Sequence, residues 1–220
     1  MGKLIEFSKP TGGSAKGYLA SAEGASTGVI VIQEWWGLND QICGVADRFA
    51  RAGYNAIAPD LYDGRVTQDP DEANHMMSGL DFPGAVQDIR GAVQYLKANG
   101  CSKVAVMGFC MGGALTIASA VHVPEMDAGV CFYGIPPKEL AEPKDIKPPM
   151  QYHFANIDDW CTPDAVNGLE AELKAAGLGA DIYRYEAGHG FFNERRGEVY
   201  NAEAAQQTWD RMMGFLSKTL

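Results

Sequence analysis

The chain has 220 residues, of which 46% are hydrophobic, and its formal net charge is -10. This length and apolar content are enough for a buried core, and because no linker-like stretch divides the sequence we expect one domain over residues 1–220. The acidic balance argues against a nucleic-acid partner, since phosphate binding needs concentrated Lys and Arg.

The first ten residues and the cysteines both favour a protein of the cytoplasm. Residues 1–10 lack the apolar core of a signal peptide, and no apolar run approaches membrane-spanning length, so no membrane partner is expected. Five cysteines without C-x-x-C spacing predict neither a disulfide framework nor a zinc cluster, and they suit a reducing compartment. We also expect a monomer, because no long apolar stripe is left without a place in the predicted core.

The first hundred residues predict four strands and three helices. Residues 28–32 are a continuous apolar run, which is typical of a strand covered on both faces. The helix after it has apolar residues at i, i+3, i+4 and i+7 from Ile42 to Phe49. The other strands are expected at 3–7, 16–20 and 54–58, and the other helices at 72–80 and from Pro83 to about 98.

The second half continues the alternation. Strands are expected at 104–107, 128–133, 150–155 and 180–185, and helices follow the first of them, at 164–176, and at the C-terminal end. Residues 186–196 are expected to form a loop. Such alternation predicts an α/β fold with a mainly parallel sheet and helices on both faces, and active sites of these folds lie beyond the carboxyl ends of the strands.

A possible nucleophile lies between the strand at 104–107 and the helix after it. Gly108-Phe109-Cys110-Met111-Gly112 has the pattern G-x-C-x-G, the cysteine form of the nucleophile elbow, in which a sharp turn exposes the reactive side chain. A β-carbon at either glycine would collide with the neighbouring chain in so tight a turn. The alternative is that Cys110 is a small buried apolar residue.

A cysteine nucleophile needs a base, and His189 is the best placed histidine. It lies between two glycines on the loop after the last predicted strand. The other histidines are weaker candidates: His75 is expected to be solvated, His122 follows the helix after Cys110, and His153 is expected in the core. For the carboxylate that orients the base, Asp158 and Asp159 are equally suitable by spacing, and both could instead cap the helix near Asp164. The order nucleophile, acid, histidine is that of the α/β-hydrolase fold.

Six motifs in this order resemble the dienelactone hydrolase family over nearly the whole chain. They are QEWWG at 33–37, PDLYDG at 59–64, GFCMGG at 108–113, Tyr133-Gly134, D-x-x-x-P at 159–163 and GHGF at 188–191. The resemblance implies an α/β-hydrolase fold that hydrolyses a small ester or lactone through a thioester, without a metal or organic cofactor.

The same resemblance assigns roles to individual residues. It implies a triad of Cys110, His189 and Asp159, and so favours Asp159 over its neighbour. It also implies that Glu34 approaches the resting cysteine and controls its ionisation, the alternative being a hydrogen bond that orders the loop. The backbone N–H groups of Met111 and Trp35 would form the oxyanion hole.

Aromatic residues beside these motifs predict an apolar substrate pocket, although ordinary core packing would explain them too. The residues expected in the pocket are Trp36, Tyr133, Trp160, Phe191 and Asn193. Asn193 is a departure from the family, because members that open dienelactones are expected to have an arginine four residues after the catalytic histidine. Arg195 and Arg196 could substitute for it, but adjacent arginines are more often a solvated pair.

The sequence therefore supports the reaction class better than the substrate. An aryl ester or an uncharged lactone suits the expected pocket better than a small anionic dienelactone. Two alternatives remain: a related hydrolase of thioesters, aryl esters or phosphotriesters, and a non-catalytic binding or thiol-sensing protein. A sensor would need a resolving cysteine, for which Cys161 is the candidate.

Overall fold

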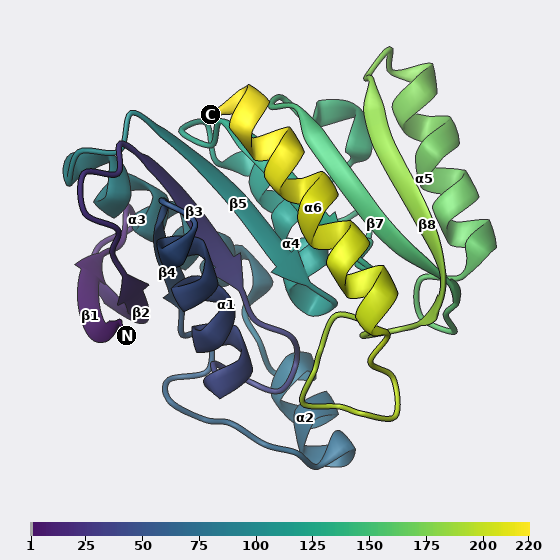
Figure 1. Ribbon diagram of the computed structural model, residues 1–220, viewed down its shortest axis with the longest axis horizontal. Helices are drawn as coiled ribbons and strands as arrows, with labels where there is room; N and C mark the ends of the chain where they lie inside the picture. Colours follow the sequence, from purple (N-terminus) through teal and green to yellow (C-terminus); the bar gives the residue numbers. More distant parts are fainter. Residues whose placement is uncertain (1) are drawn as a thin grey trace.

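The computed structural model describes residues 2–220, which contain an eight-stranded sheet (Figure 1). Its strand order is β1-β2-β4-β3-β5-β6-β7-β8. The first two strands are antiparallel to their neighbours and the other six are mutually parallel. The strands are β1 (Lys3–Ser8), β2 (Ser14–Ala20), β3 (Thr27–Ile32), β4 (Asn55–Pro59), β5 (Lys103–Phe109), β6 (Ala128–Phe132), β7 (Met150–Ile157) and β8 (Ala180–Gly188).

Helices cover both faces of the sheet. The helices are α1 (Asp40–Arg51), α2 (Pro70–Ser78), α3 (Phe82–Ala98), α4 (Met111–His122), α5 (Pro163–Ala175) and α6 (Ala202–Thr219), with a 3₁₀ turn at η1 (Pro143–Asp145). In Figure 1, α1 and α6 lie on the near face, and Phe49 of α1 packs on Trp209 of α6 with ring centroids 5.0 Å apart. Helices α3 and α4 pack against each other on the opposite face, and α5 lies beside β7 and β8.

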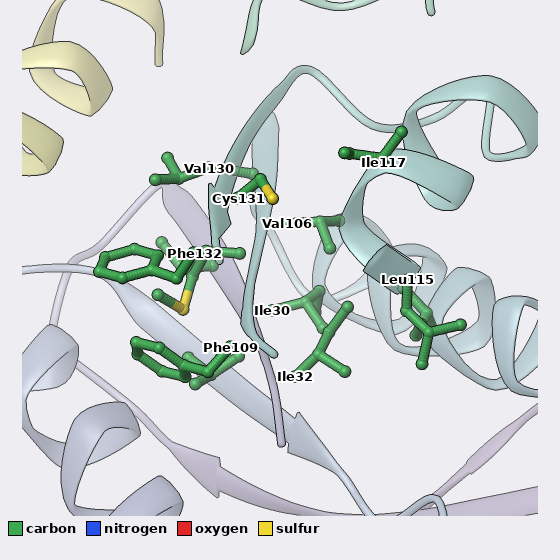
Figure 2. Packing of buried hydrophobic residues seen from close by; sticks show 14 of the residues in the cluster. Ile30, Ile32, Val106, Phe109, Leu115, Ile117, Val130, Cys131 and Phe132 are labelled. Carbon is green, nitrogen blue, oxygen red and sulfur yellow. The ribbon is translucent and has the colours of Figure 1, made fainter. Parts of the chain in front are cut away.

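The centre of the sheet is apolar on both faces. Every residue of β6 is buried, and so are all residues of β5 after its first. Figure 2 shows Ile30, Ile32 and Val106 on the side of the strands that faces Leu115 and Ile117 of α4, and Phe109 and Phe132 on the other side. Phe109 and Phe132, which are register partners, pack with centroids 4.7 Å apart. This packing makes the ends of β5 and β6 a rigid base for the residues that follow them.

The predicted alternation of strands and helices is confirmed, although several element ends differ from the expected ones by one to three residues, and two of these differences have a local cause. Helix α2 begins at Pro70, before the expected residue 72, because Asp69 accepts a hydrogen bond from the N–H of Glu72 and caps it. Strand β8 continues to Gly188, beyond the expected residue 185, because its pairing with β7 resumes after an irregularity and reaches Ile157 opposite Gly188. No helix within residues 2–220 is long and apolar enough to span a membrane.

Candidate active site

Five neighbouring strands place polar or reactive residues at one edge of the sheet. Glu34 follows β3, Cys110 follows β5, Tyr133 follows β6, Asp158 follows β7 and His189 follows β8. These strands are adjacent in the order β3-β5-β6-β7-β8 and all are parallel, so their carboxyl ends meet. Residues separated by more than 150 positions in the chain thereby come together.

Cys110 occupies a strained turn between β5 and α4. Its backbone has φ 55° and ψ -116°, a conformation that costs energy for a residue with a side chain and persists only where the surroundings enforce it. The glycines on either side make this turn possible. A β-carbon on Gly108 would overlap the carbonyl of Gly112, and one on Gly112 would lie 2.6 Å from the carbonyl oxygens of Ile32 and Gln33.

The close approach at Gly112 brings the loop after β3 against the N-terminus of α4. Met111 is the first residue of that helix, and Trp35 lies in the loop. Neither amide N–H donates to a carbonyl in the turns, loops and caps of residues 2–220. The Met111 amide lies beside the Cys110 sulfur and lowers the pKa of the thiol. Helix N-termini favour negative charge, and of the two amides only that of Met111 lies at one.

His189 is held by Asp158 and not by Asp159. The Nδ1 atom of His189 lies 2.8 Å from Oδ2 of Asp158, while Oδ1 of Asp158 accepts hydrogen bonds from the N–H groups of Trp160 and Cys161. Asp158 is 5% exposed, whereas Asp159 is exposed to solvent. The prediction of Asp159 as the partner of His189 is therefore wrong.

The reason lies in the turn after β7. The two aspartates are adjacent in the chain, and the turn through Trp160 and Cys161 closes on the carboxylate of Asp158, which leaves Asp159 outside it. Neither aspartate caps α5, whose N-cap is Thr162. Spacing in the sequence could not distinguish them, because it does not specify the direction of a side chain in a turn.

Burial and hydrogen bonding act in opposite directions on the ionisation of the cysteine and histidine. Burial raises the pKa of the Cys110 thiol and outweighs the lowering effect of His189. Burial lowers the pKa of His189, but the Asp158 carboxylate and the neighbouring sulfur outweigh it and raise the pKa above the usual value. The Nε2 atom of His189 has no hydrogen-bond partner of normal geometry within residues 2–220. The raising effect of the sulfur on His189 applies only when the thiol has lost its proton; beside an uncharged thiol, the neutral imidazole is oriented at Nδ1 and presents Nε2 to the sulfur.

Glu34 is buried and held by uncharged donors. Its Oε2 accepts a hydrogen bond of 2.7 Å from the side-chain amide of Asn193, and its Oε1 accepts one of 3.3 Å from the hydroxyl of Tyr133. Burial raises the pKa of Glu34, against the lowering effects of Asn193, His189 and Arg196. A charge on Glu34 in turn raises the pKa of Cys110. The alternative of a loop-ordering hydrogen bond therefore describes part of its role, because Glu34 joins the loop after β3 to the loop after β8.

A cavity of about 430 Å³ opens over Cys110 and His189. Of the predicted pocket residues, Trp36 and Trp160 line it, as does Trp35. Tyr133, Phe191 and Asn193 do not: they are almost fully buried beneath the cavity, where Tyr133 packs on the rings of His189 and Phe191. Sequence reasoning missed Pro70 and Met77 of the α2 region, Ile157 at the end of β7, and Val199, because apolar residues in helices and loops give no signal of facing a site.

A second cavity of about 470 Å³ adjoins the first. Trp36 and Arg196 line both cavities, whereas Asn193, Arg195 and Glu198 line only the second. The two arginines proposed as substitutes for the family's arginine are thus separated, with Arg196 alone reaching the cavity over Cys110. Residues 2–220 contain no cluster of three His, Cys, Asp or Glu side chains arranged to hold a metal ion.

A strained cysteine at a strand-turn-helix junction, followed along the chain by an acid and a histidine at later strand ends, defines the α/β-hydrolase fold. The family model described as "Dienelactone hydrolase family" matches residues 15–220. The chain belongs to the dienelactone hydrolase family and is an enzyme that hydrolyses ester bonds.

Individual relatives match along their whole lengths. "Protein usf" of Aquifex pyrophilus is 33% identical over 232 residues, covering 100% of each chain. A "Putative carboxymethylenebutenolidase" of Saccharolobus solfataricus is 33% identical and covers 96% of this chain and 97% of the relative. Among solved structures, a "Putative Dienelactone Hydrolase" of Klebsiella pneumoniae superposes with a TM-score of 0.87 at 27% identity, covering 99% of each chain.

Proposed function

We propose that this ester or lactone hydrolase uses Cys110 as its nucleophile, His189 as its base and Asp158 as the group that orients the base. One observation carries the proposal: the strained turn holds Cys110 at the floor of the cavity beside an imidazole whose Nδ1 is 2.8 Å from a buried carboxylate. Nucleophile, base and orienting acid in this arrangement are the requirements of acyl transfer.

In acylation, Nε2 of His189 takes the thiol proton as the sulfur of Cys110 attacks the ester carbonyl carbon. Because burial raises the pKa of Cys110, the resting thiol is uncharged and proton transfer accompanies attack. The carbonyl oxygen becomes an oxyanion that accepts hydrogen bonds from the amides of Met111 and Trp35. The intermediate collapses when the carbon–oxygen bond to the leaving group breaks, and the protonated His189 returns its proton to the leaving alkoxide.

In deacylation, a water molecule attacks the thioester and gives its proton to His189. The second tetrahedral intermediate breaks its carbon–sulfur bond, releasing the carboxylic acid and returning the proton to the sulfur. Asp158 keeps the same tautomer of His189 through both steps, since its carboxylate accepts only from Nδ1–H. Glu34 keeps the thiol protonated until substrate binds, because its charge opposes a thiolate nearby.

The decisive experiment is turnover and trapping with p-nitrophenyl acetate and p-nitrophenyl butyrate. We expect Cys110→Ala to abolish turnover, and acid-quenched wild type to carry the mass of one acyl group on Cys110. Cys43→Ala is the matched control, because this half-buried thiol in α1 does not line the cavity. Full turnover by Cys110→Ala would sink the proposal. A dienelactone belongs in the same panel, since a relative carries the name carboxymethylenebutenolidase.

A further inference from the structure

The catalytic cavity has little free positive charge. Among its described lining residues Arg196 is the one arginine, and there is no lysine, whereas two carboxylic acids, Glu34 and Asp159, lie on its walls. Asp159 is exposed and so meets an entering substrate directly. Apart from the catalytic His189, which is already paired with Asp158, a negatively charged substrate would therefore depend on Arg196 for charge compensation.

Arg196 is already engaged on its other side. Its Nε and a terminal nitrogen each lie 2.8 Å from Oε1 of Glu198, and its guanidinium carbon lies 5.0 Å from the centre of the Trp36 ring. Glu198 lines the second cavity and not the catalytic one. The ion pair thus directs the charge of Arg196 toward the second cavity, and the stacking on Trp36 restricts the guanidinium further.

The remaining wall of the catalytic cavity suits apolar groups. Trp35 and Trp160 meet edge to face with centroids 5.5 Å apart. Trp160 and Ile157 at the mouth are 61% and 71% exposed, so the entrance presents a large apolar surface to solvent. Burying an apolar acyl chain here is favourable, whereas burying an unpaired carboxylate carries a desolvation cost.

We propose that this site selects uncharged esters over anionic esters of the same size, and that Glu198 is a specificity-determining residue because it holds Arg196 away from the substrate. Glu198 acts through Arg196 and touches no reacting atom, so it is a positioning residue. The inference rests on the proposed function, since it concerns the substrate class of the same cavity.

The test uses two esters that differ by one group. The acyl chain of p-nitrophenyl butyrate ends in a methyl group, and that of mono-p-nitrophenyl succinate ends in a carboxylate at the same position. We expect wild type to have the higher kcat/KM for the butyrate. Glu198→Gln should raise the ratio of kcat/KM for the succinate to kcat/KM for the butyrate by about two- to fivefold, mainly through a lower KM for the succinate. This is the range that competition with one exposed ion pair allows. Higher salt should shrink this gain.

Two variants serve as controls. Adding Arg196→Gln to Glu198→Gln should remove the gain, because the freed guanidinium is its cause. Glu142→Gln removes an equal charge from an exposed ion pair with the same spacing of two residues, formed with Lys144, and should leave the ratio unchanged. Wild-type butyrate turnover in Glu142→Gln, and an unchanged thermal unfolding midpoint in every variant, show that the fold is intact.

Two results would overturn the inference, and a third would overturn the proposed function on which it rests. A ratio in Glu198→Gln equal to that in Glu142→Gln would show that Glu198 does not control Arg196. Preference of wild type for the succinate would show that the cavity already accepts anions. Absence of turnover with both esters in wild type would instead contradict the proposed function. Failure of the inference and failure of the proposed function are therefore distinguishable.

Discussion

Replacing Asp158 by Asn tests which aspartate serves the catalytic histidine. The amide oxygen of Asn could still accept from the N–H groups of Trp160 and Cys161, as Oδ1 does now. Its NH₂ group would then face Nδ1 of His189, where the carboxylate oxygen lies at 2.8 Å. Because an NH₂ group can only donate, Nδ1 would have to accept, and the proton would move to Nε2.

An imidazole protonated at Nε2 cannot take the proton of Cys110. In the serine proteases the same exchange of aspartate for asparagine lowers kcat about 10⁴-fold, and a loss of about 10³- to 10⁴-fold, or roughly 4–5.5 kcal/mol of transition-state stabilisation, is expected here. The assay is kcat/KM for p-nitrophenyl butyrate. Asp159→Asn is the matched control and should change it by less than about twofold, since an exposed carboxylate without a contact to His189 leaves the tautomer alone. A large loss in Asp159→Asn, or a small one in Asp158→Asn, would refute the assignment.

Two further predictions concern stability. Gly112→Ala should destabilise the protein by about 1–3 kcal/mol in urea denaturation, because its β-carbon would press on the carbonyl oxygens of Ile32 and Gln33. The control is Gly214→Ala in α6, where the added β-carbon meets open space and should stabilise the protein by about 0.5–1 kcal/mol. Equal effects of the two substitutions would contradict the steric explanation. Burial, helped by the charge of Arg211, lowers the pKa of His153 to about 3. Between pH 6.5 and about 3 the unfolded chain therefore binds a proton there that the native state does not, and stability falls by about 3 kcal/mol from pH 7 to pH 4.5. His153→Phe should remove that part of the pH dependence, and an unchanged dependence would show that other groups cause it.

The hydrogen bonds of His153 explain why it stays neutral. Its Nε2 lies 2.9 Å from Oε1 of Gln151, an oxygen that can only accept, so Nε2 carries the proton. Its Nδ1 lies 2.9 Å from the hydroxyl of Tyr185, which also receives a hydrogen bond from Arg211. A second proton on Nδ1 would remove the acceptor for the Tyr185 hydroxyl proton and would be repelled by the Arg211 cation. The expectation of a core histidine at this position is confirmed.

Periodicity and local motifs were sufficient for the architecture. Apolar runs such as 28–32 need burial on both faces, and only a sheet covered by helices on both sides supplies it. The glycines around Cys110 likewise predict the turn from the sequence alone. The close backbone contacts that they permit involve only β5, α4 and the neighbouring strand β3. The position of His189 at a strand end followed from the order of elements.

The identity of the residues that meet at the site depended on three-dimensional contacts. Asp158 and Asp159 are chemically identical neighbours, and only the turn after β7 decides which carboxylate faces His189. Asn193 reads as a missing arginine in the sequence, yet in the fold its amide holds Glu34 across 159 positions of the chain. Spacing in the sequence thus determined which strand ends carry reactive residues. The direction of their side chains and the pairing of Arg196 with Glu198 were decided by tertiary packing, because no local rule states where a side chain in a loop points.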